Sequence, residues 1–507
     1  MHEPDASGAP HLPDPFLRLK ASDVPTAAPV FVNAGATVAE AARAMAMAGA
    51  TAALVRPELK HHTADLGILT ERDVLVRVVA AGLDAANLPV TRIMSHPLIT
   101  VRPGDLLIEA FSRMVRHGVR RLVLLDESGA PVGLLGEGDM LAARGESPLA
   151  LAAEINAASS EAALARAFQR LQRLAARSVA EGIGSSAVGR LISEMHDRIM
   201  SQAWGLALAQ ATAEHGPAPA SHAVFLLGSQ ARREQYLATD QDLALVFAGG
   251  DPKSEAWFAA LGEGLTRILL NLGFPPCPRR IMLDNPNWRR SLDSWMDLAD
   301  NIADRPDAEG VVTASLLSDL RPLPAPPGQG GQSGSAADPD LAHGLGLGMA
   351  ARFRGSALLL KCMAREAVRF APPLGLFGGF SLKKDAEGRG SVDLKRGGVF
   401  PITQGAKVLA LEHGLHETGT QERLQALARA GTLDRQQAEG LCEANAFLQT
   451  LRMRAQAEAI GRGETPDNAI RPEELGKLDG ERLRGAFKLV ADFQGMLSGA
   501  YALHLMG

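Results

Sequence analysis

The first third of the chain carries an internal repeat of hydrophobic and polar positions. Equivalent places in the two copies hold Gly35, Glu40, Ala41, Met45 and Gly49, and then Gly104, Glu109, Ala110, Met114 and Gly118. Each copy continues into an apolar segment, at 52–55 and 122–125, and then into a glycine-containing one, at 66–70 and 132–136. This pattern predicts, twice, a strand, an amphipathic helix, two strands around a tight turn, and a helix with an acidic first turn. One copy of about 60 residues is too short to bury a complete core, so we expect both to pack as one module.

Helical spacing dominates the next segment, residues 149–215. Apolar residues three and four apart form two helical faces, which consist of Leu164, Phe168, Leu171 and Leu174, and of Leu191, Met195, Ile199 and Ala203. The spacing predicts a helical connector between the repeat module and the rest of the chain. The connector carries a His196-Asp197 doublet of the kind that metal phosphohydrolases use, but the sequence offers no further ligands to accompany it. We therefore expect this doublet on the surface of its helix.

Two short apolar strands then enclose a polar turn, at 223–227 and 243–247. The first strand ends in Gly228-Ser229, and the second is preceded by Asp240 and Asp242. Because side chains alternate along a strand, these carboxylates are expected on one face about 7 Å apart. Such a pair can hold divalent cations that also take phosphate oxygens as ligands. Glycine lets a backbone approach phosphate closely, and the amide and hydroxyl groups of Ser229 can bind its oxygens.

The last third divides into a linker and a second helical region. Residues 323–340 are rich in proline, glycine and serine, which predicts a flexible connection with nothing to bury. From Gln404 onward apolar residues again follow helical spacing. Before that point, a basic group could contact a triphosphate or an acidic partner, or form an ordinary solvated face; it consists of Lys383, Lys384, Lys395 and Arg396.

Composition narrows the range of functions. A chain of 507 residues suggests three or four domains. A net charge of −5 and an aromatic content of 4% argue against a nucleic-acid partner. The three cysteines form no CxxC pair, which argues against a disulfide framework or a thiolate zinc site and fits a reducing cytosol. No signal peptide and no apolar run of about 18 residues is found, so we expect a cytoplasmic protein without a membrane partner.

The repeat resembles a tandem CBS (Bateman) module over residues 22–146. In that family the Thr and Asp of the segment hydrophobic-Gly-hydrophobic-hydrophobic-Thr-x-x-Asp hold the ribose and phosphate of an adenine nucleotide. The resemblance implies this role for Thr70 and Asp73, whereas the second copy has Gly136 in place of the hydroxyl and retains Asp139. A dimerisation module without bound nucleotide is the alternative. In either case the resemblance suggests a homodimer.

The motif from Gly228 to Asp242 consists of Gly-Ser, ten further residues and Asp-x-Asp. It resembles the signature of the DNA polymerase β-like nucleotidyltransferases. The fuller form resembles bacterial proteins that join a CBS pair to a transferase related to the PII-protein uridylyltransferases and to a C-terminal substrate-binding domain. This resemblance implies NTP contacts from Gly228, Ser229 and Arg232, and metal ligation by Asp240 and Asp242. It also implies a third catalytic and metal-ligating carboxylate on a later strand. Asp319 is the candidate for this third role, and such a residue could act as base toward the acceptor.

These observations predict a multidomain α/β plus α protein. Its parts are a tandem CBS module, a polymerase β-like mixed α/β transferase domain and a C-terminal helical domain. The predicted boundaries are a disordered tail at 1–21, the CBS pair at 22–146, a connector at 147–216, the transferase at 217–322, a linker at 323–342 and the helical domain at 343–507.

The predicted activity is a CBS-regulated transfer of NMP from an NTP, with Mg²⁺ or Mn²⁺, to a hydroxyl acceptor, foremost on a signalling protein. The chemistry of such a site is positioning and charge neutralisation around the α-phosphorus. Two alternatives stay open. One is a nucleotide-sensing scaffold without turnover, and the other is a transferase that modifies a small molecule.

Overall fold

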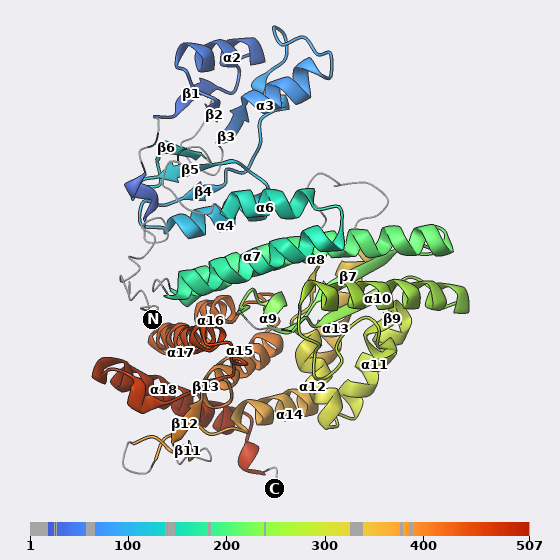
Figure 1. The fold of residues 1–507 in the computed structure, drawn as a ribbon, viewed down its shortest axis with the longest axis vertical. Coiled ribbons are helices and arrows are strands. Elements are labelled where there is room, and N and C mark those ends of the chain that lie inside the picture. The colour runs from blue at the N-terminus through green and yellow to red at the C-terminus, as the bar shows by residue number, and fades with distance from the viewer. Residues whose placement is uncertain are drawn as a thin grey trace, which may run out of the picture. The chain divides into compact units, whose positions relative to one another are not determined.

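The computed structural model describes residues 19–505, apart from 25, 27, 57–65, 137–138, 140–147, 181–183, 238–239, 325–337, 376–378 and 385–388. Most of the predicted N-terminal tail and most of the predicted linker lie outside the described residues. The chain divides into two compact units, Met1–Ala150 and Leu151–Gly507 (Figure 1). No helix of the described part is both long and apolar enough to cross a membrane.

The first unit contains two three-stranded sheets of the same design. In each, the middle strand pairs parallel with the strand before the helix and antiparallel with the strand after it. The first repeat consists of β1 (Val30–Asn33), α2 (Val38–Met47), β2 (Ala52–Arg56) and β3 (Gly67–Thr70). The second consists of β4 (Thr100–Val101), α4 (Leu107–His117), β5 (Arg121–Leu125) and β6 (Pro131–Gly136). The predicted repeat of strand, helix and two strands is therefore confirmed.

Local sequence explains where the helices of this unit begin and end. The Thr37 side chain accepts a hydrogen bond from the backbone of Glu40, whose carboxylate accepts one from the Thr37 backbone, so α2 starts at a capping box. Gly118, with a φ of 64°, ends α4 in a left-handed conformation that glycine adopts without strain. After β3 the chain forms α3 (Glu71–Val74), which continues as a π-helix over Leu75–Val79.

A four-stranded mixed sheet lies at the centre of the predicted transferase region, in the order β10-β7-β8-β9. Both middle strands are fully buried. The prediction of a strand at 243–247 is confirmed, and its partner lies one residue earlier than predicted. The strands are β7 (His222–Leu226), β8 (Leu243–Phe247), β9 (Arg289–Ser291) and β10 (Arg321–Pro322).

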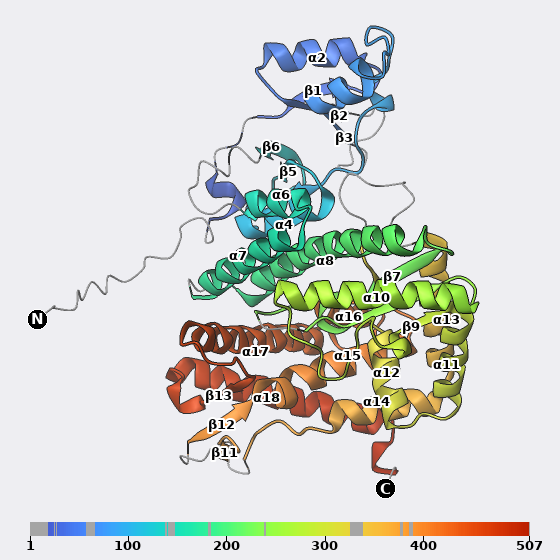
Figure 2. The ribbon, with the colours of Figure 1, turned by 45° about the vertical axis from the view of Figure 1, so that its right-hand side comes forward.

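Helices cover both faces of this sheet. On one face Phe247 stacks on Phe258 of α10 (Pro252–Leu272), with ring centroids 4.6 Å apart, and α8 (Ser185–His215) runs beside α10 (Figures 1 and 2). The opposite face, which includes Ala244 and Val246, packs on helices that follow in sequence. These helices are α11 (Leu292–Asp304), α12 (Ala308–Leu317), α13 (Pro339–Gly355) and α14 (Ala357–Val368).

The C-terminal helices enclose a second hydrophobic core. Its buried members include Ile402, Leu424, Leu448, Phe487 and Phe493. The helices are α15 (Phe400–Glu412), α16 (Thr420–Arg429), α17 (Arg435–Gly461) and α18 (Lys477–Ala500). The predicted helical domain is confirmed, with the addition of a small sheet of β11 (Lys383–Lys384), β12 (Gly390–Asp393) and β13 (Ala469–Ile470).

Two glycines of α10 provide a matched test of how closely this helix packs. A Cβ on Gly262 would lie 2.2 Å from the backbone oxygen of Leu283, whereas a Cβ on Gly264 would meet nothing within 4 Å. We expect Gly262→Ala to lower the free energy of unfolding by roughly 1–3 kcal/mol, because the clash is with backbone. Gly264→Ala should raise it by up to about 1 kcal/mol through helix propensity. Urea unfolding measures both, and equal effects would contradict this packing.

Candidate functional site

The Gly-Ser turn brings the chain directly against the second carboxylate of the motif. The Leu227 backbone donates a hydrogen bond to the Asp242 carbonyl over 3.0 Å, and the short helix α9 (Gly228–Ala231) follows. Gly228 has a φ of +55°, and a Cβ there would lie 3.0 Å from Asp242 Oδ2. Position 228 thus requires glycine both for its conformation and for its distance from the carboxylate.

Asp240 and Asp242 lie together, as predicted, and a thiol accompanies them. Ligand atoms of these two residues and of Cys277 all lie within 4.8 Å of one another. The Cys277 thiol donates to Asp242 Oδ1 over 3.0 Å. Burial and the Asp240 charge raise the pKa of Asp242 to about 6, and burial together with the Asp242 charge raises the pKa of Cys277 to about 12.

This group fits a divalent cation. The charge of Asp240 raises the pKa of Asp242 because the two carboxylates repel each other. A cation between them removes this repulsion. The carboxylate oxygens suit Mg²⁺ or Mn²⁺, and a thiolate suits softer ions. The sequence did not predict a ligand role for Cys277, because it lies 35 residues from Asp242 in a proline-rich segment without a neighbouring His or basic pair.

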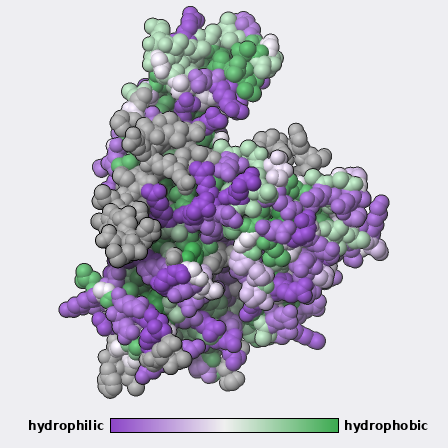
Figure 3. Space-filling view, viewed as in Figure 1, coloured by the Kyte–Doolittle hydropathy of each residue, from purple (hydrophilic) through white to green (hydrophobic). Residues whose placement is uncertain are grey.

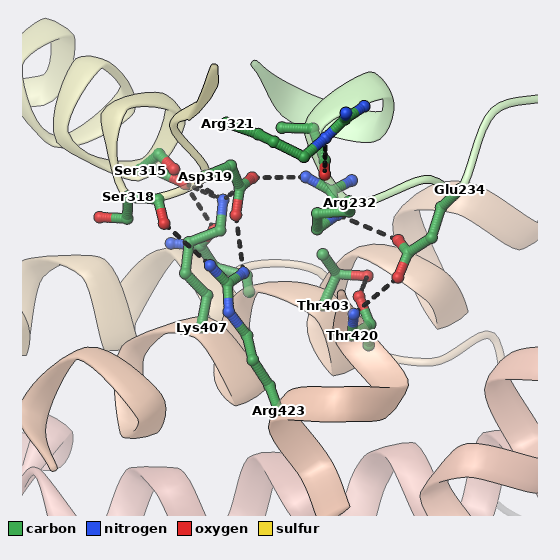
Figure 4. Close-up of polar contacts among 12 residues, drawn as sticks. Arg232, Glu234, Ser315, Ser318, Asp319, Arg321, Thr403, Lys407, Thr420 and Arg423 are labelled. Atoms are coloured by element: carbon green, nitrogen blue, oxygen red, sulfur yellow. Dashed lines mark hydrogen bonds and ion pairs between the residues drawn. The ribbon is translucent and has the colours of Figure 1, made fainter. Parts of the chain in front are cut away.

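Asp319 lies elsewhere, and its predicted setting is wrong. We expected it on a strand, but it lies in the turn between α12 and β10. It is fully buried and forms ion pairs with three cations: Arg232 at 2.5 Å, Lys407 at 2.8 Å and Arg423 at 2.6 Å (Figure 4). Burial alone would raise the pKa of Asp319, but the charges of Lys407, Arg232 and Arg423 lower it well below its usual range. Among the described residues, the acidic group that could hold a cation comprises Asp240 and Asp242 without Asp319.

The Asp319 ion cluster, formed by Asp319 with Arg232, Lys407 and Arg423, connects the Gly-Ser loop to the C-terminal helices. Lys407 comes from α15 and Arg423 from α16, as Figure 4 shows. Burial lowers the pKa of Lys407 to about 8, even though Asp319 favours its charged form. A second connection runs through Glu234, which accepts hydrogen bonds from Arg232 Nε and from the Thr420 backbone.

The other side of the loop rests on α8, where the His196-Asp197 doublet is buried rather than on the helix surface. Asp197 forms an ion pair with Arg321 at 2.7 Å, and Gln230 donates to its carboxylate. His196 contacts Gln235, and burial lowers the pKa of His196 to about 4. The prediction failed because helical spacing identifies an apolar stripe but does not show that a neighbouring loop covers the polar face. Helix α8 therefore packs as part of the transferase region and not only as a connector.

In the first unit, two of the predicted nucleotide-binding residues, Thr70 and Asp73, cap a helix. The Thr70 hydroxyl lies 2.6 Å from Asp73 Oδ2, and the two residues form a capping box at the start of α3. In the second repeat the Gly136 backbone donates to Asp139 Oδ2 over 2.8 Å. Both repeats thus hold an aspartate at the same place, and the first adds a hydroxyl.

Three family models match the chain. A "CBS domain" covers residues 90–146, "Putative nucleotidyltransferase DUF294" covers 169–309, and "Putative nucleotidyltransferase substrate binding domain" covers 357–501. The chain combines a CBS domain with both domains of the DUF294 nucleotidyltransferases. The match to the DUF294 transferase domain begins within α7 (Glu161–Ala180), inside the predicted connector, and includes all of α8.

Individual relatives of this DUF294 protein match over shorter stretches. Protein MK0525 of Methanopyrus kandleri, named as uncharacterized, is 38% identical over 76 residues, which are 15% of this chain and 39% of that protein. The CBS domain-containing protein YhcV of Bacillus subtilis is 36% identical over 74 residues, 15% of this chain and 51% of YhcV. The match to each of these relatives thus spans about half of its length or less.

Solved structures are also similar over about a quarter of the chain. A CBS domain protein from Pyrobaculum aerophilum, solved with AMP, is 30% identical, covers 24% of this chain and 89% of its own, and gives a TM-score of 0.22. A conserved protein from Pyrococcus horikoshii is 27% identical, covers 26% of this chain and 98% of its own, and gives a TM-score of 0.23.

The Asp319 ion cluster makes a strong prediction about stability. Asp319→Asn leaves the buried Lys407 and Arg423 and the half-buried Arg232 without their carboxylate and should lower the free energy of unfolding by roughly 3–5 kcal/mol. A matched control is Asp300→Asn, which removes an exposed ion pair with Arg352 and should cost about 1 kcal/mol or less. Chemical unfolding of the full chain measures both changes. Equal losses of unfolding free energy would contradict the larger contribution that we expect from the cluster.

The same variant has an expected pH dependence. Because the folded pKa of Asp319 is lowered, its stabilisation is fully present above the unfolded value of about 3.9 and is lost as the pH falls through the folded value. The difference in stability between the unaltered chain and Asp319→Asn should therefore be present at about pH 5 and shrink below about pH 4. If the difference in stability decreased as the pH was lowered from 7 to 5, the folded pKa of Asp319 would not be lowered as stated.

Proposed function

We propose that this DUF294 protein transfers a nucleoside monophosphate from an NTP to a hydroxyl group of a signalling protein. The single observation that carries the proposal is the close approach of Gly228 to Asp242, beside Asp240. It joins a backbone that can approach phosphate to a pair of carboxylates that favours a divalent cation. The subtype that we propose is a uridylyl- or adenylyltransferase.

The placement of these residues supports the following roles. Asp240 and Asp242 hold the cations, and Gly228 and Ser229 contact the phosphate oxygens. Arg232 has its guanidinium committed to Asp319 and Glu234, so it positions the loop, and its own contact with phosphate stays a prediction. Asp319 is no longer proposed as a metal ligand or base, because three cations engage its oxygens.

The proposed reaction is a displacement at the α-phosphorus. The acceptor oxygen forms a bond to this phosphorus, and the bond from the phosphorus to the bridging oxygen breaks. Pyrophosphate leaves with the bonding electron pair, and the hydroxyl proton passes to water. Bound divalent cations would neutralise the charge that develops on the entering and leaving oxygens. The protein groups contribute by positioning and by charge.

One observation favours a second candidate function, a nucleotide-sensing scaffold without turnover. The described site supplies two carboxylates with a thiol, where we expected three carboxylates from the resemblance. A site that binds the NTP–metal complex without activating an acceptor would have these residues. Turnover separates the two candidates.

Pyrophosphate release from each of the four NTPs, with Mg²⁺ or Mn²⁺ and cell lysate as the source of acceptor, tests the transfer. We expect release by the unaltered chain, abolition by a chelator, and a loss of roughly a thousandfold or more in Asp240→Ala/Asp242→Ala, because several kcal/mol of charge stabilisation disappears. Asp293→Ala, at an exposed position of α11, is the control and should keep full activity. Metal-dependent NTP binding without release from any NTP would instead favour the scaffold.

We further propose that the CBS unit binds an adenine nucleotide at Thr70 and Asp73, regulates the transferase and forms a homodimer. Apolar side chains exposed on the helix after β3 support the dimer; they are Leu75, Val76 and Val79, at 61%, 53% and 64% exposure. Figure 3 shows a green area on the first unit.

Calorimetric titration of the full chain with AMP, with light scattering on the same sample, tests this proposal. Thr70→Ala should weaken AMP binding roughly tenfold, because a hydrogen bond to a charged or polar ligand group is lost. The control is Thr37→Ala, which removes an equivalent capping box from α2 at a similar cost of about 1 kcal/mol and should leave AMP binding intact. Equal AMP affinities in the two variants would contradict the assignment, and a monomer mass would contradict the dimer.

A further inference from the structure

The C-terminal domain reaches the loop that carries the catalytic carboxylates. Tyr236, four residues before Asp240, is buried, and the guanidinium carbon of Arg452 lies 4.5 Å from its ring centroid. A guanidinium over an aromatic face is an attractive contact. Arg452 belongs to α17, so this helix supports the segment between the Gly-Ser turn and the aspartates.

Arg452 also fixes a second cation. Its Nε donates to Asn468 Oδ1 over 2.5 Å, and the Asn468 carbonyl accepts a hydrogen bond from the Leu394 backbone over 3.0 Å. Lys395 follows Leu394 directly and begins the π-helix Lys395–Val399. The position of Lys395 is therefore tied, through Asn468 and Arg452, to Tyr236 and the motif loop.

Lys395 lies near the catalytic carboxylates, on the segment that Asn468 and Arg452 connect to the motif loop. The charges that act on its ammonium are those of Asp240 and Asp242, which attract it, and of Arg232 and Arg452, which repel it. Lys395 is accessible to solvent, yet enough protein surrounds its side chain to lower its pKa. No partner for a hydrogen bond or a close ion pair with the Lys395 ammonium is found in the part of the chain that the structure describes. An accessible ammonium of this kind can engage a ligand without breaking an existing contact.

We propose that Lys395 of the C-terminal domain binds the triphosphate of the NTP, which makes the nucleotide site composite between the two domains. The assignment rests on the proposed function, because it places the NTP at Gly228 and Asp242. Arg452 and Arg232 add positive charge, but both are committed to protein partners and act as positioning residues. Lys395 is the cation that a polyphosphate can contact directly.

The neighbouring residue supplies a matched control. Arg396 is as basic as Lys395 and lies next to it in the same π-helix, but it pairs with Asp393 at 3.8 Å and lies over the ring of Phe370. The Arg396 guanidinium is thus engaged by Asp393 and Phe370, whereas the Lys395 ammonium is within reach of the charges of Asp240 and Asp242. Removal of Arg396 therefore changes local charge by the same amount without changing the proposed contact.

The test is binding of inorganic tripolyphosphate, and separately of AMP, to the full chain with Mg²⁺, measured by calorimetry. We expect Lys395→Ala to weaken tripolyphosphate binding roughly 10- to 100-fold, since a charge-assisted hydrogen bond is lost. Lys395→Arg should restore most of the affinity, and Arg396→Ala should match the unaltered chain. Binding of AMP should be unchanged in all three variants, and so should the free energy of unfolding of the second unit, which a merely structural role for Lys395 would lower.

The outcomes separate this inference from the proposed function. One outcome is that tripolyphosphate binding depends on Asp240 and Asp242 but is equal in Lys395→Ala and Arg396→Ala. This outcome overturns the role of Lys395 and is compatible with the proposed transferase site. Binding that depends on Lys395 but not on the aspartates supports the phosphate contact and overturns metal-dependent transfer. Absence of tripolyphosphate binding by the unaltered chain overturns both.

Discussion

The buried carboxylate of Asp319 is the constraint on which the second unit depends. A single buried charge is costly to remove from water, and its partners must then come from wherever the chain can supply them. Here they come from the Gly-Ser loop, α15 and α16, through Arg232, Lys407 and Arg423. All three cations contact the two carboxylate oxygens of Asp319. A different placement of the loop relative to the C-terminal helices would therefore separate at least one cation from this carboxylate. The cluster thereby fixes where the Gly-Ser turn lies.

Aspartates of the same region illustrate how surroundings decide the role of a residue type. Asp319 lies among an excess of positive charge, which lowers its pKa and makes it a structural anion. Asp242 is half-buried beside another carboxylate, and its desolvation and the Asp240 charge raise its pKa to about 6. A site with excess negative charge attracts a cation, whereas a neutralised one does not. This difference explains why Asp319, which we expected from the resemblance to be a third metal ligand, has a structural role instead.

The candidate site is assembled from segments that lie far apart in the chain. Helix α8 holds the loop from one side through Asp197 and His196, and the C-terminal domain holds it from the other through Thr420 and Arg452. The transferase motif is thus enclosed by elements both before and after it. A contribution of the C-terminal domain to nucleotide binding follows naturally from this arrangement, since its basic residues already face the loop.

The sequence by itself determined the features that depend on short-range spacing. The repeat in the first unit and the strand at 243–247 follow from local periodicity, and the spacing of Gly228, Ser229, Asp240 and Asp242 marks them as one motif. Tertiary structure alone decided the partners of Asp319, the burial of His196 and the approach of Cys277 to Asp242. Local patterns show which face of an element is apolar. They do not show which distant charges a buried polar group will meet, because that depends on how the whole chain packs.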